Sequence, residues 1–406
     1  MIVIPGKYTE ATIMTDAVEP SALEQIIKLV NNPAFEGDKI VIMPDVHAGA
    51  GVPIGTTILK RNDRIIPNVV GVDIGCGVAA YELSSSLADK ILVLGWDEVD
   101  KKIRAVVPTG FSIHNASVIS EGEREKLSFY KDLDGVCKSL DIDPGRVFRS
   151  IGTLGGGNHF IEFGMGQKRK AVFLIIHSGS RNFGLRIAKY YQEKAKRSLE
   201  EKYGGDASRY SGLEWLEGEA AENYLRDQRA AVNFAETNRT GIALLIINAL
   251  SGEGKTPRIT ATGEIRTIVK SGHNYVETYG SRLISGTIIR KGAICADKRD
   301  GIVIPLNMRD GALIATGSGN KEWNFSAPHG AGRVLSRSAA KKKLSLEEFR
   351  DTMREVASTS VCENTLDESP MAYKDPAFIE EAIKPTCTID DHIKPLYNMK
   401  DCGGKD

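Results

Sequence analysis

The sequence predicts an α+β fold, and two observations lead to this prediction. Short apolar runs of strand length are mixed with longer helical patterns, without the regular strand–helix–strand rhythm of a doubly wound sheet. No Gly-x-Gly-x-x-Gly follows a predicted strand and no P-loop is present, which disfavours a Rossmann or Walker nucleotide site. The predicted strands are 39–43, 171–176, 243–247, 301–305 and 312–316.

Three segments carry helical signals. Residues 186–202 are rich in Ala, Leu, Glu and Lys and stop before Gly204, a typical signal for the C-terminus of a helix. Residues 213–238 form a second helical region. The spacing of Ser345 and Glu348 is that of a capping box, which predicts a helix that reaches residue 356.

Composition limits the classes of protein to which the chain can belong. Its length of 406 residues is compatible with two or three domains. Basic and acidic residues balance at 53 each, so a contact with nucleic acid must come from a local patch. The six cysteines form no Cys-x-x-Cys pair, which argues against a zinc ribbon or a disulfide framework. The N-terminus lacks the features of a signal peptide and no apolar run is long enough to cross a bilayer, so we expect a cytoplasmic protein without a membrane partner.

Three histidines lie in glycine-rich or strand-end contexts, and a fourth such segment contains an aspartate and a cysteine. Thiolate, imidazole and carboxylate together suit Mn, Fe, Co or Zn better than Mg or Ca, and a thiolate can bridge two ions. The alternative is that Cys76 is a core thiol and His177 a structural histidine at the end of a buried strand. The candidate ligands for a two-metal centre are Asp73, Cys76, His159, His177 and His273.

His329 lies in a different context, Pro328-His-Gly-Ala-Gly-Arg333, where small residues leave room for a bulky ligand. A neutral imidazole is a good nucleophile towards phosphorus, and Arg333 and Arg337 follow closely enough to bind phosphate oxygens. Residues 321–343 contain six basic residues and one acidic residue, which predicts a channel for anions. For the three lysines at its end, the alternative is a solvated helix face.

These motifs, taken in order, resemble the RtcB-type RNA-splicing ligases, which join an RNA 3′-phosphate or 2′,3′-cyclic phosphate end to a 5′-hydroxyl end. The resemblance covers nearly the whole chain. The matching segments are Met43-Pro-Asp-Val-His47, Gly71-Val-Asp-Ile-Gly-Cys-Gly77, Gly152-Thr-Leu-Gly-Gly-Gly-Asn-His-Phe-Ile-Glu162, His177-Ser-Gly-Ser-Arg181, His273-Asn-Tyr275, Arg290-Lys-Gly-Ala293, His329-Gly-Ala-Gly-Arg-Val-Leu-Ser-Arg337 and Ser369-Pro-Met-Ala-Tyr-Lys-Asp375.

The resemblance implies a single domain over residues 1–406, with mixed sheets flanked by helices around a central cleft for metal and nucleotide. It implies two Mn ions held by Asp73, Cys76, His159, His177 and His273, with the cysteine shared. His329 matches the residue that becomes guanylylated by GTP. Positions that match contacts to the nucleotide are Asn158, Glu162, Asn307, Ala331, Gly332, Tyr373 and Lys400. Positions that match contacts to RNA phosphates are Arg181, Arg333 and Arg337. Asp45 matches a partner of a metal-bound histidine, and the alternative for Asp45 and His47 is a structural turn.

The implied reaction has three steps, supported mainly by positioning and charge neutralisation. His329 attacks the α-phosphate of GTP, the RNA 3′-phosphate takes over the GMP, and a 5′-hydroxyl displaces that GMP; a cyclic end is first hydrolysed. The expected role is tRNA splicing or RNA repair, and an archease-like activator is compatible with the resemblance. A dinuclear metallohydrolase that acts on phosphoesters and a non-catalytic RNA-binding or repair-scaffold protein are the alternative functions.

Two segments depart from the family pattern. Where relatives carry Pro-Gly-Ser-Met-Gly and a further serine, this chain has Pro305-Leu-Asn-Met-Arg309 and Ala312, which leaves the strictness of GTP preference open. Arg309 can reach an anion or lie on the surface. The tail lysine of the family matches Lys400, with Lys405 as the competing candidate.

Overall fold

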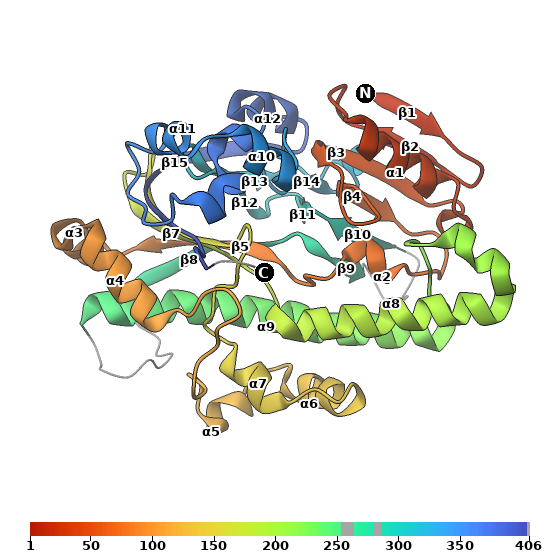
Figure 1. Cartoon of the computed structure of the whole chain (residues 1–406), viewed down its shortest axis with the longest axis horizontal. Helices are drawn as coiled ribbons and strands as arrows, with labels where there is room; N and C mark the ends of the chain where they lie inside the picture. Colours follow the sequence, from red (N-terminus) through yellow and green to blue (C-terminus); the bar gives the residue numbers. More distant parts are fainter. Residues whose placement is uncertain (253–263, 279–285, 404–406) are drawn as a thin grey trace.

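The computed structural model describes residues 1–252, 264–278 and 286–403, and its strands form two large sheets and one small one (Figure 1). The α+β prediction is confirmed, and the elements form a single domain. Segments from both ends of the chain contribute to the architecture, because the last strand lies in the middle of the larger sheet. Within the described residues, none of the helices is both long and apolar enough to cross a membrane.

The first large sheet has six strands, and only its β2–β3 pair is parallel. Alternating apolar residues of its central strands contact α1 (Pro20–Val30), which buries Ile26, Leu29 and Val30 against them. In order across the sheet the strands are β1 (Ile2–Pro5), β2 (Glu10–Ile13), β3 (Lys39–His47), β4 (Ile54–Leu59), β10 (Thr287–Lys291) and β9 (Asn274–Thr278).

The second large sheet has seven strands, all paired antiparallel. Register shifts in β12, β15 and β5 mark bulges, which increase the twist of a sheet. In order the strands are β12 (Gly301–Asn307), β13 (Gly311–Gly317), β15 (Cys387–Met399), β6 (Phe160–Gly166), β7 (Val172–Ser178), β5 (Gly77–Leu83) and β8 (Ile265–Gly272). A separate pair joins β11 (Ala293–Cys295) and β14 (Ser326–Pro328).

Two long helices, α8 (Arg181–Tyr203) and α9 (Gly218–Ser251), run along one side of the sheets (Figure 1). The 34-residue α9 packs on β5 and β7 and therefore supports the strands that carry the candidate site. The shorter helices are α2 (Pro67–Val70), α3 (Ser85–Leu94), α4 (Trp96–Val106), α5 (Glu121–Arg124), α6 (Tyr130–Ser139), α7 (Pro144–Arg149), α10 (Arg337–Lys343), α11 (Leu346–Thr352) and α12 (Pro376–Ile383).

Four of the five predicted strands are confirmed, in β3, β7, β12 and β13. The fifth prediction, a strand at 243–247, is wrong because this apolar run lies near the end of α9. Its apolar residues at 242, 243, 246, 247 and 250 all contribute to one hydrophobic cluster, a spacing that matches two turns of helix. A short run that is apolar on every side cannot distinguish a buried strand from a buried helix.

The helix predictions are right in kind and less accurate at the ends. The segment 186–202 lies within α8, and Gly204 ends that helix with φ +58°. The second helix spans 218–251 instead of 213–238. The predicted capping box is present: Glu348 donates its backbone N–H to Ser345 Oγ at 3.1 Å, but α11 already ends at Thr352.

Candidate active site

A tight loop between α2 and β5 presents Asp73 and Cys76. Gly71 and Gly75 have φ of +88° and +75°, values that L side chains rarely adopt. A Cβ on Gly75 would lie 2.8 Å from the backbone of Val232 on α9, so only glycine lets the loop approach that helix. The backbone N–H of Cys76 donates to the carbonyl of Asp73 at 3.2 Å, which closes the turn.

Three strands of the second sheet, β6 and β7 on one side of β5 and β8 on its other side, bring the histidines to this loop. His159 immediately precedes β6, His177 lies on β7, and His273 follows β8. The register pairs His177 with Val78 of β5 on one side and with Phe160 of β6 on the other. Sheet register therefore gathers residues that are up to 200 positions apart in the sequence.

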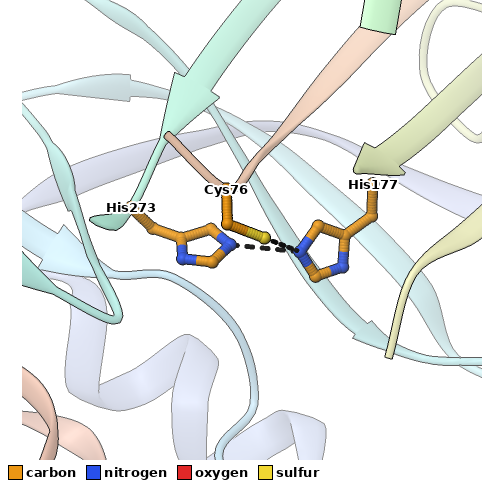
Figure 2. A group of neighbouring side chains, drawn as sticks. All are labelled: Cys76, His177 and His273. Carbon is orange, nitrogen blue, oxygen red and sulfur yellow. Dashed lines mark hydrogen bonds between the residues drawn. The ribbon is translucent and has the colours of Figure 1, made fainter. Parts of the chain in front are cut away.

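The five candidate ligands form two groups that share the thiol of Cys76. In one group, Cys76 Sγ lies 3.3 Å from His177 Nε2, which lies 3.1 Å from His273 Nε2 (Figure 2). In the other, His159 Nε2 lies 3.4 Å from Cys76 Sγ and 3.1 Å from Asp73 Oδ2. Within each group the ligand atoms lie within 4.8 Å of one another.

The chemistry of these contacts fits a bound cation. His159 Nδ1 faces the carbonyl of Leu154 at 3.0 Å and therefore carries the proton, which leaves Nε2 as a lone pair directed at the Asp73 carboxylate. Burial and the neighbouring histidines hold the pKa values of His177 and His273 well below the usual range, so both rings are neutral. The lone pair of His159 Nε2 and the Asp73 carboxylate face one another at 3.1 Å and repel unless a cation lies between them, and both groups have the ligand chemistry to hold a metal ion.

His329 lies beside this cluster, with its ring centroid 4.7 Å from that of His273. Asp45, fully buried at the end of β3, accepts hydrogen bonds from His329 Nδ1 at 2.6 Å and from its backbone N–H at 3.2 Å. The Nδ1 proton is thereby fixed, and Nε2 keeps its lone pair. The prediction that Asp45 supports a metal-binding histidine is wrong, because its partner is His329.

Two glycines allow this arrangement. Gly332 has φ +71°, and a Cβ there would lie 2.3 Å from the carbonyl oxygen of Asp45. Gly292 has φ +61°, and its Cβ would lie 3.2 Å from Cε1 of His329 and 2.2 Å from Ile54. The backbone at Gly292 therefore lies close to the ring of His329, and the backbone at Gly332 lies close to Asp45, the partner of that ring.

A cavity of about 480 Å³ opens beside His329 and joins the metal-ligating groups to most of the other predicted site residues. Its lining includes four of the five candidate ligands; His159 is not part of it. The predicted nucleotide-binding and RNA-binding residues that line it are Asn158, Glu162, Asn307, Ala331, Gly332, Arg333, Arg337, Tyr373 and Lys400. The structure thus brings residues from eight separate segments of the chain around one space.

Glu162 and Lys400 both line this cavity. Asn398 donates its amide to Glu162 Oε2 at 2.8 Å, while the buried Oε1 has no partner among the described residues. Burial raises the pKa of the Glu162 carboxyl to about 8. Lys400 Nζ donates to the carbonyl of Asn158 at 3.1 Å, and burial lowers the pKa of its ammonium. The competing Lys405 lies outside the described residues.

The segment that departs from the family pattern forms a self-contained turn at the cavity wall. Asn307 Oδ1 accepts the backbone N–H groups of Arg309 and Asp310, and its amide donates to the Asp310 carboxylate at 2.7 Å. Arg309 pairs with Asp310 through two hydrogen bonds of 2.8 Å and lies on the surface outside the cavity lining. Ala312 is buried in β13.

The three predicted RNA-binding arginines do not share one environment. Arg333 and Arg337 line the cavity, but Arg181 does not, because its guanidinium donates to Thr153 Oγ1 and to the carbonyl of Gly110. The predicted anion channel is partly neutralised. Arg337 and Lys341 form ion pairs with Asp367 at 2.7 and 3.3 Å.

Sequence reasoning missed the residues that organise the far side of the cavity. Glu368 is buried and accepts hydrogen bonds from Arg337, Tyr373 and Lys400. It directly precedes the matching segment Ser369–Asp375, and that position was the one available signal. Asn398, which positions Glu162, lies two residues before Lys400 on β15.

The sequence of this chain matches a known protein family over most of its length. The family described as tRNA-splicing ligase RtcB matches residues 25–401. The chain belongs to the RtcB family. RtcB relatives include "RNA-splicing ligase RtcB" of Escherichia coli (strain K12), 33% identical over 88% of both chains, and "RNA-splicing ligase RtcB1" of Escherichia coli (strain ATCC 25922), with the same identity and coverage. The "tRNA-splicing ligase RtcB" of Nanoarchaeum equitans is 28% identical and covers 94% of this chain and 88% of its own.

Proposed function

We propose that this RtcB-family chain is a Mn- and GTP-dependent RNA ligase that joins 3′-phosphate or 2′,3′-cyclic phosphate ends to 5′-hydroxyl ends. One observation carries the proposal: His329, oriented by Asp45, lies with its ring 4.7 Å from that of His273, and both line the same cavity. A nucleophile and a metal-ligating group in one enclosed space are what a phosphoryl transfer to histidine requires.

Two groups of residues would hold the metal ions. Asp73, Cys76 and His159 would bind one, and Cys76, His177 and His273 the other, with the thiolate shared. Bound Mn²⁺ would neutralise phosphate charge and polarise the reacting phosphorus. The imidazoles contribute by staying neutral at physiological pH, because only a neutral ring offers a lone pair.

The nucleotide would lie between Glu162 and His329. Guanine presents two N–H donors beside a carbonyl oxygen, and the unpartnered Glu162 Oε1 with the nearby Lys400 ammonium offers the complementary acceptor and donor. Asn158, Asn307, Ala331, Gly332 and Tyr373 line the same space.

The chain's own groups define the three steps. His329 Nε2 attacks the α-phosphorus of GTP and releases pyrophosphate, while Asp45 stabilises the positive charge that develops on the ring. The RNA 3′-phosphate then takes GMP from His329 and becomes RNA-3′-pp-5′-G. A 5′-hydroxyl attacks the 3′-phosphorus and GMP leaves. A cyclic end is hydrolysed beforehand to the 3′-phosphate.

Arg333 and Arg337 would bind the RNA phosphates at the cavity, with Arg181 contributing from outside its lining. The names of the relatives support RNA as substrate and tRNA splicing or RNA repair as the role. An archease-like activator is part of the proposal. A cytoplasmic location is also proposed, in keeping with six free thiols in the chain.

The test is covalent labelling with α-labelled GTP and Mn²⁺. We expect label on the denatured wild-type protein and none on His329→Ala, together with joining of a cyclic-phosphate RNA to a 5′-hydroxyl RNA. Wild-type protein that takes up no label with any divalent metal would overturn the proposal. Label without joined RNA would limit the activity to nucleotide transfer.

A further inference from the structure

One buried carboxylate, Glu368, lies in the wall of the cavity and accepts hydrogen bonds from four side chains. Its Oε2 accepts from Tyr373 OH at 2.7 Å and from Lys400 Nζ at 3.1 Å. Its Oε1 accepts from Arg337 Nη1 at 2.7 Å and from Arg333 Nη1 at 3.4 Å. The two oxygens therefore divide the partners, with proposed nucleotide contacts on one and proposed RNA contacts on the other.

The charge of this group is secured by its surroundings. Glu368 is 2% exposed, and burial alone raises the pKa of a carboxyl, but Lys400, Arg337 and Arg333 reverse the effect and hold the pKa at about 2. The buried Lys400 in turn has Glu368 as its carboxylate partner. Removing the charge of Glu368 would therefore leave the buried Lys400 ammonium without its carboxylate partner.

The contact with Glu368 is one of two hydrogen bonds that hold the Lys400 ammonium. Lys400 follows β15, and its ammonium reaches only two hydrogen-bond acceptors among the described residues, the carbonyl of Asn158 and Glu368 Oε2. A lysine side chain has four rotatable bonds and loses rotamer freedom when it is held in one orientation. The side chain of Tyr373 is held by the same carboxylate, because its hydroxyl donates to Glu368.

We propose that Glu368 is a positioning residue for the nucleotide step: it fixes the Lys400 ammonium and the Tyr373 hydroxyl in the orientation that receives the guanosine nucleotide. The inference rests on the proposed function. Glu368 also connects the two sides of the cavity, because the same carboxylate orients Arg333 and Arg337. Glu368 itself acts through these groups and touches no reacting atom.

The experiment measures labelling of the protein by α-labelled GTP without RNA, as KM for GTP and as maximum rate. Glu368→Gln removes the charge and should raise KM about 10- to 100-fold, the effect expected when charge-assisted hydrogen bonds to two contact groups are lost. The maximum rate should change by less than about 3-fold, because Asp45 and His329 remain in place. A purely structural role would lower the active fraction and leave KM unchanged.

Two comparison variants separate positioning from general loss of charge. Asp367 is the adjacent buried acid; it pairs with Arg337 and Lys341, and no described contact joins it to Lys400 or Tyr373. Asp367→Asn removes an equal charge from the neighbouring position and should raise KM for GTP less than about 3-fold. Glu363→Gln, at an exposed position of the 3-10 helix Glu363–Glu368 that also contains Asp367 and Glu368, should behave as wild type.

If Glu368→Gln does not fold, Glu368→Asp provides the same test in a folded protein. It retains the charge that the buried cations need but is one methylene too short to meet both pairs of partners, so KM should rise about 3- to 10-fold in a folded protein. A wild-type KM in a folded Glu368 variant, or an equal rise in Asp367→Asn, would overturn the inference. Wild-type protein that is not labelled would instead overturn the proposed function.

Discussion

Replacement of Asp45 tests the orientation of His329 most directly. Asp45 Oδ2 accepts both Nδ1–H and the backbone N–H of His329, at 2.6 and 3.2 Å, while its buried Oδ1 has no partner among the described residues. Because the backbone N–H selects an acceptor, Asp45→Asn should place its carbonyl oxygen at the position of Oδ2. The tautomer of His329 is then preserved and only the negative charge is lost.

The expected magnitudes follow from these contacts. Loss of the charge that stabilises the developing imidazolium should cost about 1–2 kcal/mol, or about 5- to 30-fold in the rate of guanylylation. Asp45→Ala also removes the acceptor that fixes the ring and its proton, so the total cost should be about 3–4 kcal/mol, or about 10²- to 10³-fold. KM for GTP should change little, since the nucleotide contacts are untouched.

The assay is single-turnover labelling with α-labelled GTP at saturating Mn²⁺, with melting temperatures measured in parallel. Asp16→Asn, an exposed aspartate, is the control for substitution itself and should label at the wild-type rate. Labelling of folded Asp45→Ala at the wild-type rate would refute the reasoning. Equal rates for the Asn and Ala variants would show that charge alone matters and orientation does not.

Three further predictions concern the metal ions, pH and the backbone. Cys76→Ala should lower bound Mn²⁺ by more than one ion per chain and abolish labelling, because both groups share this thiol; unchanged occupancy by elemental analysis would contradict the assignment. Glu162 has a folded-state pKa of about 8, above its unfolded value, so the folded protein binds the extra proton and loses stability as pH rises from about 4.5 to 8. Urea unfolding of Glu162→Gln should therefore show a stability advantage over wild type that grows through this window; a constant difference would refute it. Gly332→Ala should destabilise the chain by about 1–3 kcal/mol and slow labelling, because a Cβ at φ +71° would meet the backbone of Asp45, and wild-type stability and rate would contradict this.

The sequence predicted the fold class and most single elements because periodicity and terminal signals are local properties. The capping box of Ser345 and Glu348 depends only on residues within one turn of helix, whatever the helix packs against. Gly204 ends α8 because the backbone at this position has a positive φ. The prediction failed at 243–247, where burial on all sides removes the periodic signal. Burial of this helix segment on all sides results from packing against distant parts of the chain, which a local sequence pattern does not contain.

The candidate site could be predicted in composition but not in its internal partners. Residue types and glycine contexts at Cys76, His177 and His273 identified residues that the structure places close enough together to hold a metal ion, since thiol and imidazole chemistry is carried by the residue itself. Asp45 was assigned to the wrong histidine and Glu368 was missed. Both errors concern which side chain accepts a hydrogen bond from which donor, and one of the two contacts spans 284 positions in sequence.

By itself, then, the sequence determined the residue types that can bind metal, attack phosphorus and pair with phosphate, together with the turns that present them. Only the tertiary structure decided which of them meet. Strand β15 inserts between β13 and β6 and so delivers Lys400 to Asn158 and Asn398 to Glu162, while β3 delivers Asp45 to His329. Such pairings depend on sheet order and register, which are set by the packing of the whole chain and leave no local trace in the residues that they join.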